Sequence, residues 1–456
     1  MSALWTSADI ESATLGKAYK PFAANGLSID TRTLKEGDLY LAIKGDRRDG
    51  HDFIREAFEA KAAAALVSRP PEPGGVGGAL LMVANTQRAL EDLACASRAR
   101  SDAKIVAVTG SAGKTTTKEM LKLAFGALGK THASRASLNN RWGVPLTLAS
   151  LPRDAAFGVV EIGMNHFGEI RPLVSFARPH VALVTTIAPA HLEFFGTCEA
   201  IADAKSEIFE GIVPGGAALI PYDNPHAERL IARAKQTHVA RILGFGAKPG
   251  SDARLLSYDE SAEGARVKAD ILGQPVEFRV GAPGPHIAAN ALGALLCVAA
   301  ADGDVLNAAA ALKRFSALKG RGARFMAGGV EVIDESYNAN PASMAAALAL
   351  LGKATGRRIA VLGDMLEMGP DASAHHAGLA APLEAARADL VFLCGPLMQA
   401  LWDVLPAQQR AAYAPDSAAL AAGVSSALRA GDTVLVKGSN GSRMSVIIEA
   451  LKARTG

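Results

Sequence analysis

The segment from Val106 to Thr117 constrains the fold of this chain more than any other part of the sequence. An apolar run at 106–108 leads into the sequence TGSAGKT at 109–115, and a helix-forming run follows directly. Backbone N–H groups in such a turn, together with the N-terminus of the next helix, form a cradle for anionic phosphate. We therefore predict a nucleotide-binding loop made of Gly110, Ser111, Ala112, Gly113, Lys114, Thr115 and Thr116.

Two side chains of this loop have a predicted chemical role. Lys114 can reach the terminal phosphates, and the Thr115 hydroxyl can hold Mg²⁺. The loop is two residues shorter than the common P-loop, which has glycine where this chain has Val108. The alternative is an ordinary glycine turn before a helix. The order of strand, turn, Lys-Thr and helix favours the phosphate-binding interpretation.

The rest of the chain alternates short apolar runs with helical patterns, which is typical of α/β proteins with parallel sheets. A chain of 456 residues is too long for a single core. We expect an α/β fold of three domains, with a central P-loop-type parallel-sheet domain and a C-terminal Rossmann-like domain. The expected domains cover residues 1–84, 85–314 and 315–456.

Individual elements follow from the same patterns. The expected strands are 39–43, 63–67 and 80–83 in the first domain, 105–108, 158–162, 181–187 and 217–220 in the second, and 330–334, 358–362, 390–393 and 433–436 in the third. An amphipathic helix is expected at 86–100. No helix follows the glycine-rich run at 74–78, so we interpret that run as a turn and not as a phosphate site.

Charge and hydropathy exclude several classes of protein. The net charge of +3 is spread along the chain without a basic block, so a nucleic-acid partner is not expected. No apolar stretch approaches the roughly 20 residues of a membrane span, and the N-terminus, with Asp9 and Glu11, does not look like a signal peptide. Four widely spaced cysteines without metal-binding spacing favour a reducing compartment. We therefore expect a cytoplasmic protein without a membrane segment.

Polar residues follow two of the strands expected in the central domain. Glu161 ends the apolar run 158–162, and His191 follows the strand expected at 181–187. Ligands of open α/β sheets bind outside the carboxyl ends of the strands, where both residues and the phosphate loop are expected. Taken singly, Glu161 is more simply an ion-paired strand end and His191 a solvated loop histidine. Their shared location beside the loop favours a Mg²⁺ site, since this ion needs few protein ligands besides phosphate and water.

Lys205 is predicted to point into the protein. The segment 199–212 is expected to be a helix capped by Thr197, with an apolar stripe that includes Lys205. Asp203, Glu207 and Glu210 are expected on the opposite face. An inward lysine must pair, be chemically altered, or extend its ammonium to the surface, and the last alternative stays open at this point.

Taken in this order along the chain, these residues resemble the Mur ligase family of cell-wall synthesis. The resemblance extends over essentially the whole chain, and the family also has the short Thr-Gly-x-x-Gly-Lys-Thr loop. Further matching segments are Asn139–Pro145, Glu161–Ile170, Ile333–Pro341, Gly363–Gly369 and Lys437–Ser442. Trp142 replaces the usual aliphatic residue in the first of these segments, and the last departs from the commoner Lys-Gly-Ser-Arg form.

The resemblance implies a metal site in the central domain. Glu161 and His191 would serve Mg²⁺ together with Thr115. Lys205 would carry a CO₂-derived carbamate, an anion that also serves a metal, and this would account for an inward lysine on an apolar stripe.

The resemblance also implies a site for ATP. Asn290 would lie near the adenine, and Arg321 would contact the nucleotide phosphates. Asp334, at the end of a strand, would bind the ribose hydroxyls. The residues expected to be catalytic are Lys114, Lys205, His191 and Arg321.

Two substrate sites are implied as well. Residues that resemble the uridine-nucleotide-binding segments of the family, and that alone would be taken as polar turns, are Ser28, Asp30, Arg32, Lys44, Gly45, Asp49, Gly50 and His51. A polar pocket for a small dipeptide is expected from Asn139, Asn140, Asn165, His166, Tyr337, Asn338 and Asn340.

The implied reaction is the ATP-dependent formation of an amide bond. The γ-phosphoryl group would pass to a carboxylate of UDP-N-acetylmuramoyl-tripeptide, and the amine of D-alanyl-D-alanine would attack the acyl phosphate. We expect a monomer whose domains close on their ligands, since the P-loop and Asp334 lie in different domains yet must serve one ATP. The alternatives are another amide ligase of this fold, such as a folylpolyglutamate synthetase-like enzyme, and a nucleotide-gated regulatory ATPase.

Overall fold

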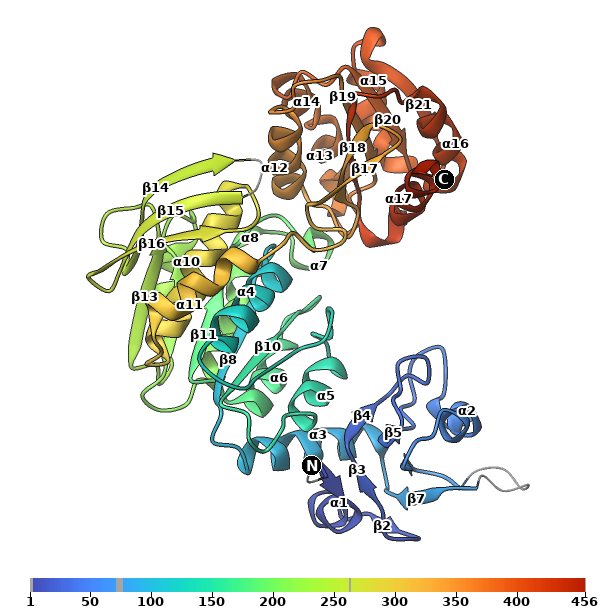
Figure 1. The fold of residues 1–456 in the computed structure, drawn as a ribbon, viewed down its shortest axis with the longest axis vertical. Coiled ribbons are helices and arrows are strands. Elements are labelled where there is room, and N and C mark those ends of the chain that lie inside the picture. The colour runs from blue at the N-terminus through green and yellow to red at the C-terminus, as the bar shows by residue number, and fades with distance from the viewer. Residues whose placement is uncertain (1–2, 71–76, 262–263, 456) are drawn as a thin grey trace.

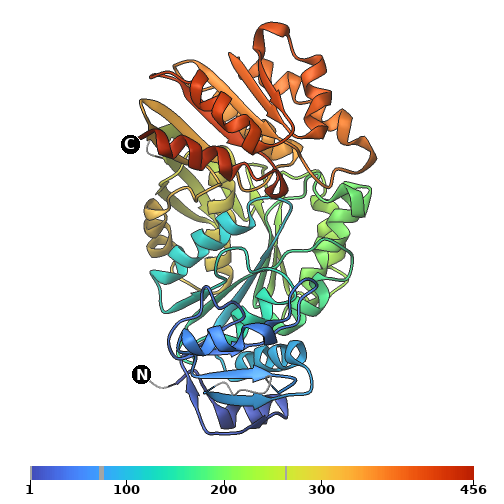
Figure 2. The same ribbon diagram turned by 90° about the vertical axis from the view of Figure 1, so that its right-hand side faces the viewer.

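The computed structural model describes residues 3–70, 77–261 and 264–455. Three domains follow one another along the long axis of the molecule, with the N-terminal domain at one end and the C-terminal domain at the other (Figure 1, Figure 2). Each domain is built on its own sheet, with a two-stranded ribbon added to the first. None of the helices in the described ranges is long and apolar enough to cross a membrane.

The first domain contains a five-stranded sheet in which all strands except β2 are parallel. In sheet order the strands are β2 (Lys17–Ala18), β7 (Ala79–Met82), β6 (Ala64–Val67), β5 (Asp38–Leu41) and β4 (Gly26–Ser28). The other elements are β1 (Trp5–Thr6), α1 (Ser7–Thr14), β3 (Ala23–Ala24), η1 (Gly50–Phe53) and α2 (Ile54–Glu59). The three expected strands are confirmed as β5, β6 and β7, whereas strands of two or three residues are too short to produce a periodic pattern. Residues 74–76 of the expected glycine turn lie outside the described residues.

Two helices join the first domain to the central domain. Helix α3 (Thr86–Ala99), which confirms the expected helix, places Leu90 in the core of the first domain and continues toward the central core. Helix α5 (Gly143–Ala149) belongs to the central domain but also packs in the first core. The indole N–H of Trp5 donates to the carbonyl of Ala149 at 2.8 Å. The two domains therefore meet in a packed interface, and the exact boundary at 84/85 stays a prediction.

The central sheet has nine strands in the described part of the chain. In sheet order they are β16 (Gln274–Val280), β15 (Gly264–Ile271), β14 (Ala253–Ser261), β13 (Arg241–Gly246), β12 (Ala217–Pro221), β11 (Val181–Val184), β8 (Lys104–Thr109), β10 (Phe157–Glu161) and β9 (Thr131–Ala133). The four strands expected here are confirmed as β8, β10, β11 and β12, although β11 ends at Val184 and not at Ile187. The strands from β9 to β14 are parallel, as expected for a P-loop domain.

The far edge of this sheet is antiparallel and extends the expected parallel part by strands that the sequence did not predict. β15 pairs antiparallel with both β14 and β16. The turn between β15 and β16 consists of Leu272 and Gly273, which both have positive φ angles (54° and 85°). Such a two-residue turn matches the right-handed twist of a hairpin. Buried and exposed residues alternate along β16, so this edge is a half-covered extension of the sheet.

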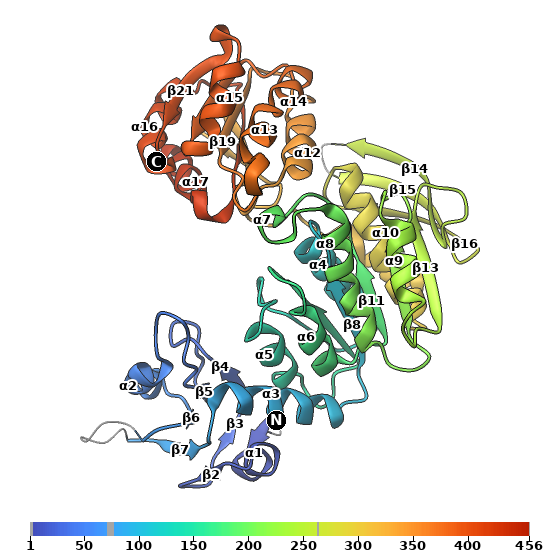
Figure 3. The same ribbon diagram turned by 180° about the vertical axis from the view of Figure 1, so that it is seen from behind.

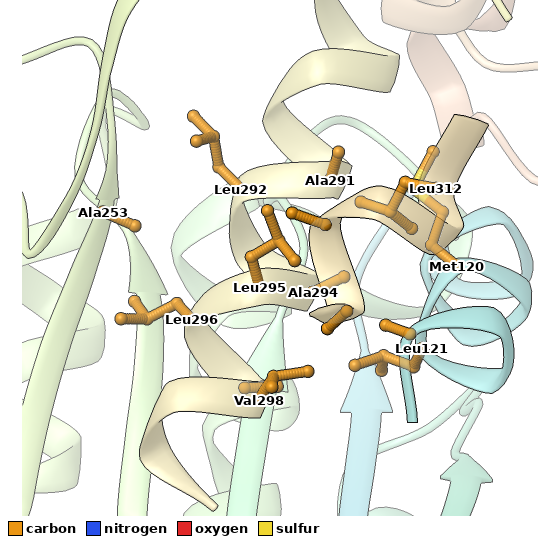
Figure 4. Close-up of a cluster of buried hydrophobic side chains, with 14 of the residues drawn as sticks. Met120, Leu121, Ala253, Ala291, Leu292, Ala294, Leu295, Leu296, Val298 and Leu312 are labelled. Atoms are coloured by element: carbon orange, nitrogen blue, oxygen red, sulfur yellow. The ribbon is translucent and has the colours of Figure 1, made fainter. Parts of the chain in front are cut away.

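Helices cover both faces of the central sheet. One face carries α4 (Lys114–Gly126), α10 (Pro285–Ala300), α11 (Val305–Ala311) and η3 (Leu312–Arg314). The other carries α5, α6 (Ile170–Ala177), α7 (Leu192–Phe195), α8 (Cys198–Ser206), η2 (Glu207–Gly211) and α9 (Ala227–Ala234). Figure 4 shows how Leu295 and Val298 of α10 pack toward Leu121 of α4. This packing holds α4, the helix that begins at the phosphate loop, against the sheet.

The third domain has a six-stranded sheet in which only β17 runs antiparallel. In sheet order the strands are β17 (Ala323–Ala327), β18 (Val330–Glu335), β22 (Thr433–Lys437), β19 (Arg358–Gly363), β20 (Leu390–Cys394) and β21 (Arg410–Ala414). The four strands expected here are confirmed as β18, β19, β20 and β22. Phe315 packs in the core of the central domain, and the boundary at 314/315 stays a prediction.

Helices cover both faces of the third sheet as well, which makes the domain Rossmann-like. One face carries α12 (Pro341–Leu351), η4 (Gly369–Asp371), α13 (Ala372–Ala377), α14 (Ala380–Ala385), η5 (Pro396–Met398) and α15 (Gln399–Val404). The other carries α16 (Ser417–Ala427) and α17 (Ser445–Lys452). The short helices η6 (Ala407–Gln409), η7 (Asn440–Ser442) and η8 (Ala453–Thr455) complete the domain.

Candidate active site

The predicted phosphate loop connects β8 to α4. Gly110 and Gly113 have φ angles of 151° and 82°, which few other residues adopt. A side chain on Gly110 would collide with the Thr185 hydroxyl, and a Cβ on Gly113 would lie 2.9 Å from Oδ1 of Asn290. Asn290 therefore lies against the loop, as expected for a residue near the nucleotide. Helix α4 starts without a side-chain cap, so its first N–H groups can bind phosphate.

Lys114 lies at the start of α4, where its ammonium donates to the carbonyl of Gly110 at 2.6 Å. Burial lowers the pKa of this lysine to about 8, although the charge of Glu161 opposes this and the charge of Arg321 adds to it. Arg321 belongs to the third domain, so its charge reaches the phosphate loop of the central domain. The structure thus brings together three of the residues that were predicted from distant parts of the sequence.

The segment that follows β11 is bound to the phosphate loop, and this explains why the strand is shorter than expected. Ser111 donates through its backbone N–H to the carbonyl of Thr186 at 2.8 Å. The Ser111 hydroxyl accepts from the backbone of Ala188 at 3.0 Å. The Thr185 hydroxyl donates to the carbonyl of Ala112 at 2.5 Å. These bonds hold the loop that carries His191 beside the loop that carries Lys114.

Glu161 is buried at the end of β10, next to the phosphate loop. Its Oε1 accepts from the Thr115 hydroxyl at 3.2 Å and from the Asn139 amide at 2.8 Å. Its Oε2 is buried, and no described residue donates to it. An anionic oxygen without a partner in such a position suits a cation. Glu161 and Thr115 therefore have the placement that a Mg²⁺ site requires.

Lys205 points inward, as predicted, and its side chain is 0% exposed. Its Nζ has no hydrogen-bond partner among the described residues. The ammonium therefore does not extend to the surface. Burial holds the pKa of Lys205 well below its usual value, and the nearby charge of Lys114 lowers it further.

The direction of the Glu207 side chain differs from the one predicted for a regular helix. Helix α8 ends at Ser206 and continues as the tighter η2. The carboxylate of Glu207 consequently turns inward and accepts from the backbone N–H groups of Gly168 and Arg171, at 2.8 and 3.2 Å. It was expected on the solvent-facing side, because the prediction assumed a regular α-helix throughout.

His191 lies between the central and third domains. Its Nδ1 is 2.5 Å from Oε2 of Glu367, which belongs to the third domain. Sequence reasoning included Glu367 in a matching motif but gave it no role. No group of three His, Cys, Asp or Glu side chains suited to a metal ion occurs among the described residues. A Mg²⁺ ion held by Thr115, Glu161 and His191 would take its other ligands from phosphate and water.

The loop that carries Arg321 is held by Asp334. The carboxylate of Asp334 is buried and accepts from the backbone N–H of Gly320 at 2.9 Å and from the Ser336 hydroxyl at 2.6 Å. The guanidinium carbon of Arg321 lies 3.9 Å from the centre of the Tyr337 ring. Asp334 therefore positions Arg321 in this structure, and its contact with a ribose stays a prediction.

A cavity of about 640 Å³ opens between the first and central domains, apart from the phosphate loop. This volume is typical of sites for small organic ligands. The predicted residues that line it are Ser28, Asp30, Arg32, Gly45 and Gly50. Sequence reasoning missed Arg48, Arg135 and Trp142, which also line it. Arg48 lies between Gly45 and Asp49, which were assigned to this site, and Trp142 lies within the matching segment Asn139–Pro145, but no local pattern indicates Arg135.

Three residues predicted for this site do not line the cavity: Lys44, Asp49 and His51. Asp49 accepts from the backbone and ring of His51, at 3.0 and 2.6 Å. The other ring nitrogen of His51 accepts from the backbone of Ser68 at 2.9 Å. Asp49 and His51 therefore shape the loop behind the cavity.

The remaining predicted residues lie in three separate loops. Asn140 accepts from the backbone at the start of α5, and Asn340 caps α12. The carbonyl of Asn338 accepts from Lys437 at 2.9 Å. His166 contacts Glu169 at 3.1 Å, and the backbone of Asn165 donates to the same carboxylate. Much of this polar set already has structural partners, so its contact with a dipeptide stays a prediction.

The fold and the site define a three-domain P-loop protein in which an arginine of the third domain approaches the phosphate loop. Models of the Mur ligase family match most of the chain: the family's catalytic domain at 24–116, the Mur ligase middle domain at 108–298, and the Mur ligase glutamate ligase domain at 320–440. The chain belongs to the Mur ligase family.

Individual relatives match over almost the full length. The UDP-N-acetylmuramoyl-tripeptide–D-alanyl-D-alanine ligase of Rickettsia prowazekii (strain Madrid E) is 31% identical over 447 residues, which cover 98% of this chain and 99% of that protein. A crystal structure of MurF from Acinetobacter baumannii superposes with a TM-score of 0.86 at 29% identity and covers 98% of this chain and 99% of that one. MurF from Thermotoga maritima, solved with ADP, has a TM-score of 0.78 at 25% identity and covers 94% of this chain and 97% of that one.

Proposed function

We propose that this chain is an ATP-dependent amide ligase that joins D-alanyl-D-alanine to UDP-N-acetylmuramoyl-tripeptide in peptidoglycan precursor synthesis. The observation that carries the proposal is the buried Glu161 held against Thr115 of the phosphate loop, where the charge of the third-domain Arg321 also acts on Lys114. The full-length relatives that bear the name of this ligase support the same reaction. A folylpolyglutamate synthetase-like enzyme is not favoured.

The reaction has two steps. In the first, a carboxylate oxygen of the tripeptide attacks the γ-phosphorus of ATP, the bond to ADP breaks, and an acyl phosphate forms. In the second, the amine of D-alanyl-D-alanine attacks the acyl carbon, phosphate leaves, and the amine loses a proton. Lys114 and Arg321 stabilise negative charge on the transferred group, and positioning by the surrounding protein contributes much of the remaining rate enhancement.

The residues present fit a Mg²⁺ ion, because the buried Oε2 of Glu161 has no partner among the described residues. Thr115, Glu161 and His191 would hold the ion, which supplies charge neutralisation at the phosphates. Asn139 and Thr115 hold the other oxygen of Glu161 and so orient its carboxylate.

Lys205 carries a carbamate in the active enzyme under this proposal. The neutral amine adds to the carbon of CO₂, a nitrogen–carbon bond forms, and one proton is released. Burial supports this, since it lowers the pKa of Lys205 and so favours the neutral amine at moderate pH. Incubation with ¹³C-bicarbonate should give a carbamate signal in the NMR spectrum that is lost in Lys205→Met. A wild-type protein without this signal at saturating bicarbonate contradicts the modification.

The cavity and the polar loops support the following substrate sites in this proposal. The uridine nucleotide lies in the cavity lined by Ser28, Asp30 and Arg32, and the dipeptide lies near Asn165 and Tyr337. The chain acts as a monomer in the cytoplasm, because one chain supplies all three domains of the site and the reaction consumes ATP.

In the assay, the protein is incubated with ATP, Mg²⁺, UDP-N-acetylmuramoyl-tripeptide and one amino acceptor at a time. The acceptors are D-alanyl-D-alanine, L-alanyl-L-alanine, D-alanine, L-lysine and glutamate. ADP release and the amide product are measured. We expect both only with D-alanyl-D-alanine or close D,D-dipeptides, since a site that hydrogen-bonds its ligand can reject poor analogues by up to about 10⁴-fold. Lys114→Ala should fold normally and lose nearly all ligation.

The other outcomes separate the alternatives. Preferred turnover with glutamate or lysine would assign the chain to another member of the family. ADP release that does not depend on any acceptor would favour a regulatory ATPase.

A further inference from the structure

The contact between His191 and Glu367 joins two domains through residues 176 positions apart. Besides the contact of their side chains, the backbone carbonyl of Glu367 accepts from the backbone N–H of Glu193 at 3.1 Å. Both His191 and Glu367 have left-handed backbones, with φ angles of 57° and 62°. Such conformations are unfavourable outside glycine and occur often at functional sites.

Packing around this contact holds the two segments in register. Leu192 contacts the apolar cores of both the central and the third domain. Gly369 lies against α7, since a Cβ at this position would be 3.4 Å from the backbone nitrogen of Glu193. Figure 3 shows α7 at the junction, directly below the third domain. The carboxylate of Glu367 therefore contacts His191 only when the third domain is docked against the central domain.

A neutral imidazole has one nitrogen that donates and one that accepts, and the partner of the first determines the role of the second. An ionised carboxylate can only accept, so Glu367 selects the form of His191 in which Nδ1 carries the proton. Nε2 is then the nitrogen with the free lone pair, and no described residue forms a hydrogen bond with it, whereas Nδ1 contacts Glu367. This pattern is common in histidines that serve metal ions.

We propose that Glu367 is a positioning residue that selects the tautomer of His191 from the neighbouring domain, so that docking of the third domain completes the ion site of the central domain. The proposal rests on the role of His191 in the proposed ligase. It makes the metal site conditional on domain arrangement, because the orienting carboxylate and the imidazole belong to different domains.

An ion pair between the same two domains provides a matched control. Lys353 of the third domain contacts Glu260 of the central domain at 2.6 Å. Neither side chain contacts His191, so Lys353→Ala weakens the docking of the domains without removing the partner of the imidazole. Glu367→Ala removes that partner, and Glu367→Met does so while preserving most of the side-chain volume.

The experiment measures the tautomer and the ion affinity separately. In ¹⁵N-histidine-labelled protein at alkaline pH, where histidine rings are neutral, His191 should show a protonated Nδ1 in the wild type and in Lys353→Ala. Both Glu367 variants should shift toward protonated Nε2. Binding of Mn²⁺ in the presence of an unreactive ATP analogue, followed by electron paramagnetic resonance, should weaken about 10- to 100-fold in the Glu367 variants, and by much less in Lys353→Ala.

Two results would overturn the proposal. One is an unchanged tautomer in both Glu367 variants. The other is an equal loss of Mn²⁺ affinity in Lys353→Ala, which would assign the effect to domain docking alone. Failure of the proposed ligase function would be seen differently, as a wild-type protein that does not form the amide product.

Discussion

Replacement of Lys205 by methionine should stabilise the protein and abolish its activity. The lysine is completely buried, and its Nζ has no partner among the described residues. A buried polar group without a hydrogen bond costs about 1–3 kcal/mol, and methionine removes that group while keeping a similar shape. For a domain of this size, each kcal/mol raises Tm by about 2–4 °C. We therefore expect Lys205→Met to melt about 2–12 °C above the unmodified wild type.

The effect should depend on pH, with a defined sign. Because burial lowers the pKa of Lys205, the folded protein binds this proton less readily than the unfolded chain. Above the usual pKa of 10.5 the amine is neutral in both the folded and the unfolded state, so proton binding does not change the free energy of unfolding. As the pH falls below 10.5, only the unfolded chain takes up the proton, so the wild type loses stability. The advantage of Lys205→Met should therefore increase as the pH falls from 10.5 toward neutrality.

The assay is calorimetric unfolding in CO₂-free buffer, at several pH values and with ADP release measured in parallel. Lys118 provides the control, because it is also 0% exposed but donates to the carbonyls of Ser134 and Ala136, at 2.9 and 2.8 Å. Lys118→Met leaves these carbonyls without their partner and should destabilise the protein. If Lys205→Met also destabilises it, or if its advantage over the wild type does not vary with pH, the reasoning is refuted.

Three further predictions concern the ligand sites. Gly113→Ala should destabilise the protein by about 1–2 kcal/mol, because φ at this position is 82°. The same substitution should raise KM for ATP, because the added Cβ crowds Asn290, and an unchanged KM in the ADP-release assay would contradict this. Arg321→Lys keeps the charge but loses the planar contact with Tyr337, so kcat should fall about tenfold or more; equal kcat values would argue against a role in transfer. Trp142→Ala should raise KM for the UDP substrate about tenfold without affecting KM for ATP; similar changes in both values would indicate a general loss of structure.

Much of the site could be predicted because its geometry is local. The spacing of Gly110, Gly113 and Lys114 specifies a turn that enters a helix, and the structure has that turn. Helical periodicity was sufficient to predict that Lys205 points inward, and its side chain is buried. The apolar runs identified buried strands such as β8, β10 and β18, since a buried strand needs little more than a short apolar run between turns. They did not identify β14, β15 and β16, the longest of the described strands. The antiparallel edge of the central sheet was missed, although residues of β16 alternate between buried and exposed positions.

The sequence by itself determined the phosphate loop, the parallel strands that support it and the family of the protein, because each depends on residues that are neighbours along the chain. Only the tertiary structure decided that Glu367 meets His191, that Lys205 lacks a partner, and that Trp142 lines a cavity shared by two domains. These spatial relations result from the order of strands in each sheet and from the docking of whole domains. Both depend on the sum of many weak packing contacts, which no local pattern of residues records.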